Sequence, residues 1–193
     1  MINIRAFILG RYPIRGFLAW AAGDHDALFV DPGGWDDAVL DTLNAYDLTV
    51  RAIMLTHGHW DHTEGLDQAV ANLNAPVYAH AGDGDMLARM PDVMLDGGEA
   101  IGIGALCWRV LAVPGHTPGS VAYAAGDIVF TGDTLFAGAI GGTATRDLYQ
   151  QERIGINEQL FPLGDAMRVY PAHGPATTIG TERHYNPFLR SRV

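Results

Sequence analysis

The segment Thr56-His57-Gly58-His59-Trp60-Asp61-His62 constrains this chain more than any other feature of its sequence. It places imidazoles and a carboxylate directly after the apolar run Ala52-Ile53-Met54-Leu55. Such a run is typical of a buried strand, so the polar side chains gather where that strand ends. Imidazole and carboxylate together bind divalent first-row ions such as zinc, iron or manganese. The segment therefore predicts a metal site at the end of a strand.

The spacing within this segment separates two pairs of side chains. Alternate residues of an extended chain point to the same side, so His57 and His59 are expected to share one side of the segment. Asp61 and His62 follow where the chain turns, and we expect them to face a second ion from the opposite side of the loop. Two neighbouring ions need a bridging oxygen between them.

Composition and charge narrow the class of protein. The chain has 193 residues, of which 48% are hydrophobic and 18% are charged, as is typical of a globular enzyme with a substantial core. We expect a single domain over residues 1–193, because no linker, short repeat or low-complexity tract divides the chain. The formal net charge of −10 and the lack of an arginine cluster along the sequence argue against a nucleic-acid partner.

The only cysteine, Cys107, excludes a disulfide within the chain, and its apolar neighbours predict a buried thiol. The N-terminal residues lack the basic start, long apolar stretch and cleavage site of a signal peptide. No run reaches the ~20 apolar residues of a membrane span. We therefore expect a cytoplasmic protein without a membrane partner.

Strand-like and helix-like segments alternate in both halves of the chain. Apolar runs predict strands at 2–9, 17–22, 27–30, 50–55, 77–78, 105–113, 121–124, 128–131 and 167–170, and helical periodicity predicts helices at 36–46, 64–73, 147–160 and from about residue 178 onward. Two β-rich halves that each carry helices predict an α/β fold. The expected architecture is a four-layer αβ/βα sandwich of two facing mixed β-sheets flanked by helices.

Three further polar residues follow predicted strands in turns rich in proline and glycine. His116 lies in Gly115-His116-Thr117-Pro118-Gly119-Ser120, Asp133 in Gly132-Asp133-Thr134-Leu135-Phe136, and His173 in Pro171-Ala172-His173-Gly174-Pro175. Rigid turns hold ligands at fixed positions. A lone histidine at a strand end is usually a structural residue, but beside the histidine-rich segment all three become candidate metal ligands.

The order of these residues resembles one known superfamily. His57-Gly58-His59-Trp60-Asp61-His62, followed by His116, Asp133 and His173, is similar to the ligand series of the metallo-β-lactamase-fold hydrolases. The segments around His116, Asp133 and His173, with Asn186-Pro187-Phe188 after them, resemble the small single-domain members of the glyoxalase II-like (hydroxyacylglutathione hydrolase-like) branch. The resemblance covers nearly the whole chain and implies the metallo-β-lactamase fold.

The resemblance also implies a role for each residue. It implies that a first metal ion is bound by His57, His59 and His116, a second by Asp61, His62 and His173, and that Asp133 bridges the two. Asp61 and Asp133 are then the catalytic carboxylates. Asp31, in Val30-Asp31-Pro32, matches a family aspartate that lies behind the ligands.

These roles predict a dinuclear metal-dependent hydrolase. The cofactors are two divalent metal ions, zinc before iron or manganese, because this ligand set accepts all three. Two ions about 3.5–4 Å apart generate and aim a bridging hydroxide, which attacks the carbonyl carbon of a bound substrate. The expected enzyme is a glyoxalase II-like thioesterase that acts on hydroxyacylglutathione or a related small thioester or ester.

Two alternatives on the same fold stay open at this point. Persulfide dioxygenases use one iron held by the residues that match His57, His116 and Asp133, and the segment 146–151 faintly resembles a loop of those enzymes. Lactonases use the same ligands with a different pocket.

The sequence constrains the substrate-contact residues less than it constrains the metal ligands. Full-length glyoxalase II enzymes carry a C-terminal helical domain whose basic residues bind glutathione, and this chain has only residues 178–193 there. Arg146 and Tyr149 are candidates for replacing that contact, although an ordinary helix start explains the same residues. Trp60 and Phe136 are candidates for the apolar wall of the substrate pocket.

Overall fold

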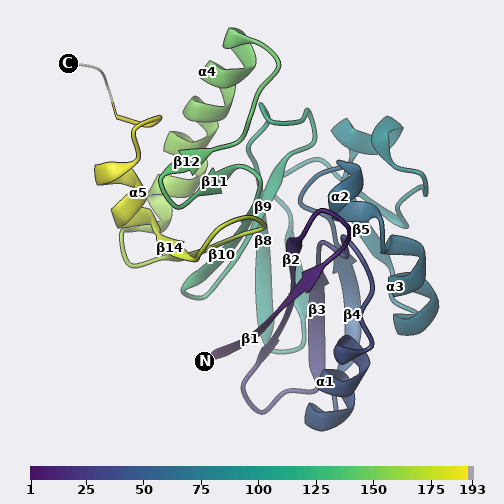
Figure 1. The fold of residues 1–193 in the computed structure, drawn as a ribbon. Helices are drawn as coiled ribbons and strands as arrows, with labels where there is room; N and C mark the ends of the chain where they lie inside the picture. The colour runs from purple at the N-terminus through teal and green to yellow at the C-terminus, as the bar shows by residue number, and fades with distance from the viewer. Residues whose placement is uncertain (191–193) are drawn as a thin grey trace.

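The computed structural model describes residues 1–190 and contains two β-sheets that face each other, with helices on the outer side of each (Figure 1). The first sheet has the order β1 (Ile2–Leu9), β2 (Ile14–Ala21), β3 (Asp26–Val30), β4 (Thr49–Met54), β5 (Val77–His80) and β6 (Val93–Leu95). The second has the order β14 (Thr177–Thr178), β13 (Arg168–Pro171), β10 (Ile128–Gly132), β9 (Val121–Ala125), β8 (Leu106–Ala112) and β7 (Ala100–Ile103). A small hairpin joins β11 (Leu135–Phe136) to β12 (Ala139–Ile140).

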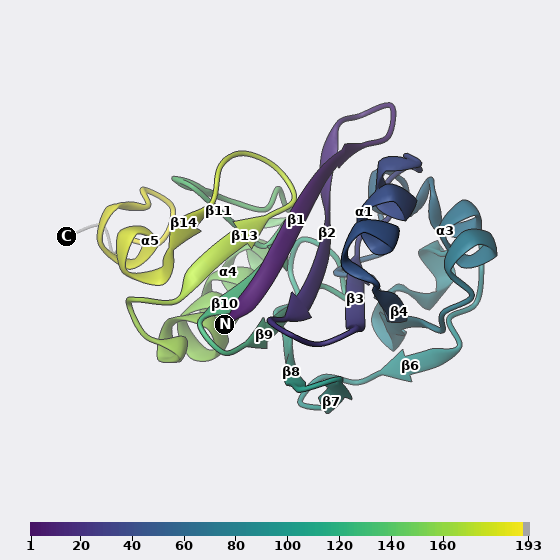
Figure 2. The ribbon, with the colours of Figure 1, turned by 90° about the horizontal axis from the view of Figure 1, so that it is seen from below.

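The helices form the two outer layers. The first sheet is covered by α1 (Ala38–Tyr46) and α3 (Leu66–Leu73), and the second by α4 (Arg146–Gly155) and α5 (Ile179–Tyr185). Seen from below, α1 and α3 lie on one side of the sheets, and α4 and α5 on the other (Figure 2). The short helix α2 (Trp60–Thr63) and the 3-10 helix Ala81–Met86 lie in the loops after β4 and β5.

Both sheets are mixed, as the sequence predicts. In the first, β1, β2 and β3 are antiparallel, whereas β3 to β6 are parallel. In the second, β10 runs parallel to β13 and antiparallel to β9. Every residue of β9 and β10 is buried, because these strands are covered on both faces by the opposite sheet and by the outer helices.

The two sheets share one core. Phe17 and Met54 of the first sheet pack with Trp108 and Phe130 of the second in one buried cluster, and the Phe17 and Phe130 rings stack 4.9 Å apart. Separate clusters lie between each sheet and its helices. The predicted domain of residues 1–193 includes 191–193, which lie outside the described residues. Across residues 1–190, no helix is long and apolar enough to cross a membrane.

Two local predictions are wrong. Cys107 is exposed, because side chains alternate along β8 and its neighbour Trp108 takes the inward position. The helix predicted at 147–160 is shorter: α4 ends at Gly155, and the chain continues in a π-helical turn over Ile156–Leu160. Gly155 lies against Val113, where a Cβ would approach the Val113 Cγ1 atom to 2.8 Å.

Candidate metal centre

The predicted ligands come from loops that follow four strands. The histidine-rich segment follows β4, His116 follows β8, Asp133 follows β10 and His173 follows β13. A hydrogen bond of 2.9 Å from the Val121 amide to the Thr56 carbonyl joins the two sheets beside the site. The structure therefore brings the predicted residues together at one edge of the sandwich, where α/β sheets commonly place binding sites.

His57, His59 and His116 form a first group whose ring nitrogens converge. His59 Nδ1 lies 3.0 Å from His57 Nε2 and 2.9 Å from His116 Nε2. An ion bound tetrahedrally at about 2.0–2.1 Å from each nitrogen would separate its ligands by roughly 3.4 Å. The observed separations are close to that value, so the group fits a single metal ion.

Asp61, His62 and His173 form a second group, and their ligand atoms lie within 4.8 Å of one another. Asp133 lies between the two groups: its oxygens are 3.3 Å from His62 Nε2, 3.6 Å from His173 Nε2 and 3.8 Å from His116 Nε2. One carboxylate therefore faces both groups, as a bridging ligand must.

Two atoms at the centre of the site have no hydrogen-bond partner within residues 1–190. They are His62 Nε2 and Asp133 Oδ1, which are both buried and lie 3.3 Å apart without the geometry of a hydrogen bond. Leaving a buried polar atom unpaired costs about 1–3 kcal/mol, so native structures rarely keep two such atoms side by side. A divalent cation would satisfy both, which is a second indication that the residues fit a metal ion.

Burial and neighbouring charge set different protonation states in the two groups. Burial lowers the pKa of His57 well below its usual value and also lowers the pKa of His59, and neighbouring imidazoles act in the same direction. Burial also works against a charge on His62, but the carboxylates of Asp31 and Asp133 outweigh it and raise the pKa of His62 to about 10. His57 and His59 are therefore ready to bind a cation, whereas His62 must release a proton first.

Asp31 lies directly behind the ligands. Its carboxylate accepts hydrogen bonds from the Thr56 amide (2.7 Å), the Thr56 hydroxyl (2.6 Å) and His62 Nδ1 (3.0 Å). Thr56 Oγ1 in turn lies 3.2 Å from His57 Nδ1. Asp31 thus directs the Nε2 lone pairs of two histidines toward the site, one directly and one through Thr56.

Two further contacts fix the loop that carries His116. The Gly142 carbonyl accepts a hydrogen bond of 2.7 Å from His116 Nδ1, which leaves Nε2 free to bind a cation. Asp83, from the 3-10 helix after β5, accepts hydrogen bonds from the Gly58 amide (2.7 Å), the Thr117 hydroxyl (2.7 Å) and the Gly119 amide (2.6 Å). Asp83 thereby joins the two loops of the first ligand group.

Sequence reasoning missed both Asp83 and a second buried acid, Glu152 of α4. Glu152 is fully buried, and neither of its carboxylate oxygens has a hydrogen-bond partner within residues 1–190. Burial, with a smaller contribution from the charge of Asp133, outweighs the opposing effect of the nearby Gly141 amide and raises the pKa of Glu152 to about 8. A Cβ added to Gly141 would lie 2.5 Å from Glu152 Oε1 and 2.9 Å from His116 Cβ, so this acid lies immediately behind the His116 loop.

Of the candidate substrate-contact residues, Phe136 and Trp60 lie beside the ligands. Phe136 packs its ring 6.2 Å from that of His173, while Trp60 is half exposed and packs edge-on against Tyr12. Arg146 begins α4, where the Thr145 hydroxyl accepts a hydrogen bond of 3.2 Å from the Leu148 amide. Arg146 thus lies at a helix start, and a contact of Arg146 or Tyr149 with substrate stays a prediction.

A search against protein-family models matches residues 16–173 to the metallo-beta-lactamase superfamily. The chain belongs to this superfamily. The predicted family and the predicted four-layer fold are both confirmed, and the chain is a metallo-hydrolase of that fold.

Two relatives in this superfamily match most of the chain. A probable metallo-hydrolase of Bacillus subtilis, YqgX, is 33% identical and the alignment covers 92% of this chain and 93% of YqgX. The hydroxyacylglutathione hydrolase GloC of Haemophilus influenzae is 30% identical, with 88% of this chain and 90% of GloC covered.

Two solved superfamily structures are similar over nearly the whole chain. The crystal structure of the BLEG-1 B3 metallo-beta-lactamase superposes with a TM-score of 0.90 at 30% identity, covering 98% of this chain and 100% of that one. The crystal structure of ETHE1 from Myxococcus xanthus superposes with a TM-score of 0.82 at 28% identity, covering 96% of this chain and 83% of that one. The fold is thus shared by proteins that carry different names.

Proposed function

We propose that this superfamily member is a dinuclear metal-dependent hydrolase that cleaves hydroxyacylglutathione or a related small thioester. The observation that carries the proposal is the position of Asp133, whose oxygens lie 3.3–3.8 Å from ring nitrogens of both ligand groups. The similarity to GloC supports the choice of a thioester. The proposal includes zinc as the first metal, with iron and manganese as alternatives, and a cytoplasmic enzyme without a nucleic-acid or membrane partner.

Two bound ions would supply activated water at neutral pH and a Lewis acid for the substrate carbonyl. The protein's part is to hold and orient the ligands. One ion would be held by His57, His59 and His116, and the other by Asp61, His62 and His173. Asp133 would face both ions. Asp31 fixes the tautomers of His57 and His62, so that the lone pairs are already aimed when an ion arrives.

A thioester suits this donor set. A thiolate is a good leaving group and departs without a proton, so the reaction needs no dedicated general acid. A reaction that uses metal-activated water also needs no nucleophilic serine or cysteine beside the ligands. The single cysteine of the chain, Cys107, lies on β8 and is not among the ligand groups.

Persulfide dioxygenation is the second candidate, because the ETHE1 structure is similar over 96% of this chain. That reaction would use one iron at the residues His57, His116 and Asp133. The gathered second group of Asp61, His62 and His173 favours the dinuclear hydrolase over it. Lactone hydrolysis stays a prediction that no observed contact favours.

Metal analysis and activity measured on one sample test the proposal. The protein is purified without added metal or chelator, its metals are counted by mass spectrometry, and turnover of S-lactoylglutathione is assayed with oxygen consumption on a persulfide in parallel. About two equivalents of metal with thioester turnover are expected. About one equivalent of iron with oxygen consumption would instead establish the dioxygenase.

The variant Asp61→Ala separates the two reactions further. It removes one ligand of the second group and leaves the first group intact, so the hydrolase should lose close to one metal equivalent and at least 100-fold in kcat/KM. Asp67→Ala is the control, because Asp67 is an exposed carboxylate on the neighbouring α3. Unchanged hydrolysis by Asp61→Ala at full metal loading would overturn the dinuclear mechanism.

A further inference from the structure

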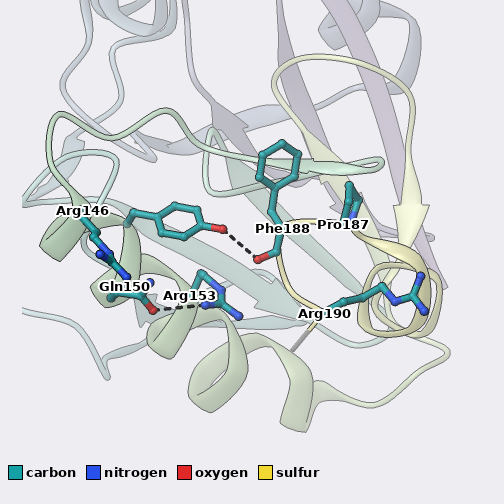
Figure 3. Close-up of a pocket in the computed structure, with 7 residues that line it drawn as sticks. Arg146, Gln150, Arg153, Pro187, Phe188 and Arg190 are labelled. Carbon is teal, nitrogen blue, oxygen red and sulfur yellow. Dashed lines mark hydrogen bonds between the residues drawn. The ribbon is translucent and has the colours of Figure 1, made fainter. Parts of the chain in front are cut away.

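A cavity of about 650 Å³ lies between α4 and the chain segment that follows α5. Figure 3 shows Arg146, Gln150 and Arg153 along one face of α4, with Phe188 and Arg190 of the C-terminal segment across from them. Tyr149 closes one wall, and its hydroxyl donates a hydrogen bond of 3.1 Å to the Phe188 carbonyl. The cavity therefore has arginines on two sides and aromatic rings between them.

The charge of this cavity is opposite to that of the whole protein. The chain has a formal net charge of −10, yet the lining holds three arginines and no acidic residue. Within residues 1–190, the arginines found in ion pairs are Arg11, Arg51, Arg168 and Arg183, none of which lines the cavity. The cavity is therefore a local centre of positive charge, and its arginines have no carboxylate from the described part of the chain.

Arg153 is the best-fixed of the three side chains. It donates a hydrogen bond of 3.2 Å to Gln150 Oε1, and its guanidinium carbon lies 5.6 Å from the centre of the Tyr149 ring. Its Nε atom is buried and has no acceptor within the described residues. A guanidinium that is held in place and incompletely paired is a strong site for a carboxylate or phosphate, because it presents a fork of donors at little entropic cost.

The cavity is separate from the metal centre. Glu152 and Leu148 of α4 face the His116 loop, where a Cβ added to Gly115 would lie 2.9 Å from Glu152 Cα and 2.8 Å from the Leu148 carbonyl. In a helix with about 100° per residue, Arg146, Gln150 and Arg153 project from the opposite side. The helix thus lies between the cavity and the ligand loop.

We propose that this cavity binds a small organic molecule with two or more anionic groups, either carboxylates or phosphates. Arg146 and Arg153 on the helix and Arg190 at the rim are spread over the cavity, which favours a ligand with several separated charges over a single small anion. The exposed ring of Phe188 and the Tyr149 ring offer apolar contact for the part of the ligand that joins those charges. The proposal does not depend on the reaction at the metal centre.

Binding of defined anions tests the proposal. The metal-loaded protein is titrated with citrate, with pyrophosphate and with acetate, and binding is followed by calorimetry at low and moderate salt. Citrate or pyrophosphate should bind with an affinity that falls as salt rises, and acetate should bind at least tenfold more weakly than the better of the two. Which of the two binds more tightly identifies the anionic group.

Matched variants locate the site. Arg153→Gln should weaken binding by at least roughly tenfold, because it removes a charge-assisted contact. Arg109→Gln removes the same charge from an exposed position on β8 and should leave binding unchanged. Metal content should be unaffected in both variants, and circular dichroism confirms that both are folded.

Three results would overturn the proposal. One is the absence of binding by both polyanions to the folded, metal-loaded protein. A second is equal weakening by Arg153→Gln and Arg109→Gln, which would mean that the anion responds only to total charge. A third is binding that strips metal from the protein, detected by metal analysis after dialysis, because the anion would then act at the metal centre. The first two results do not bear on thioester turnover, which is measured separately on protein without added polyanion.

Discussion

Replacing Glu152 with glutamine tests whether this buried acid destabilises the protein above neutral pH. The side chain is fully buried, and neither carboxylate oxygen has a hydrogen-bond partner within residues 1–190. Burial raises its pKa to about 8, with the charge of Asp133 acting in the same direction. Glutamine has nearly the same shape but does not ionise, so Glu152→Gln removes the titration while keeping the packing of α4.

The magnitude follows from the difference between the folded and unfolded pKa values. The pKa is about 8 in the folded protein and 4.5 in the unfolded chain, a difference of about 3.5 units. At about 1.36 kcal/mol per unit, this corresponds to about 5 kcal/mol. The folded state binds the proton more tightly, so the contribution of Glu152 to the free energy of unfolding is fully present below pH 4.5 and is lost as the pH rises to about 8.

Urea unfolding of the metal-free protein at intervals from pH 5 to pH 9 measures this loss. The wild-type free energy of unfolding should fall by several kcal/mol more than that of Glu152→Gln over this interval, with the two proteins of similar stability at pH 5. In the zinc-loaded protein the difference should shrink, because a cation offsets the charge of Asp133. Glu158→Gln, at an exposed position just beyond α4, is the control and should follow the wild type.

The reasoning is refuted if the unfolding free energies of wild type and Glu152→Gln run parallel from pH 5 to pH 9. Parallel curves would mean that Glu152 ionises in the folded protein as easily as in the unfolded chain. That result would require water or a compensating charge at the carboxylate.

Three further substitutions test the contacts around the ligands. Asp31→Asn should weaken metal affinity about 10- to 100-fold in competition with a chelator, because the tautomers of two ligand histidines are no longer fixed; unchanged affinity would contradict this role. Asp83→Ala should lower the free energy of unfolding by about 2–4 kcal/mol in urea, since it leaves the Gly58 and Gly119 amides unpaired and removes one partner of the Thr117 hydroxyl; a loss below about 1 kcal/mol would argue against it. Gly132→Ala should cost at least about 2 kcal/mol in the same assay, because Gly132 has φ +50° and its Cβ would overlap Thr56. Gly138→Ala, at φ +77° with nothing within 4 Å, is its control and should cost less.

The sequence is informative about the ligands because their pattern is local. His57, His59 and His62 lie within one short segment, and the remaining candidates each follow an apolar run in a turn rich in glycine and proline. In each case the apolar run predicts a strand and the turn predicts where that strand ends. The gathering of these ligands at one edge of the sheets could therefore be anticipated. Strand β1 was predicted to its exact ends and β8 to within one residue at each end, whereas the prediction for β2 began three residues late. The short strands β6, β7, β11, β12 and β14 were missed because they carry too little pattern.

The residues that support the ligands were not predictable, because their partners are distant in the sequence. Asp83 contacts Gly58 and Gly119, which lie 25 and 36 positions away, and its own segment reads as an ordinary loop. Glu152 reads as one polar residue on an amphipathic helix, and its burial depends on how α4 packs against the His116 loop. The arginines of the cavity likewise come together only when the segment after α5 returns to α4.

These contacts also explain why the sequence predicts the metal ligands but not the substrate. Asp31 follows a strand of the first sheet, and the Thr56 segment that it holds is bonded at 2.9 Å to Val121 of the second sheet. The positions of the ligands therefore depend on the core that defines the fold. Any chain that folds with this core tends to keep the same ligand geometry. Trp60 and Phe136, by contrast, lie on α2 and on a short hairpin outside both main sheets. Substitutions there leave the core unchanged, so relatives with the same ligands can act on different substrates.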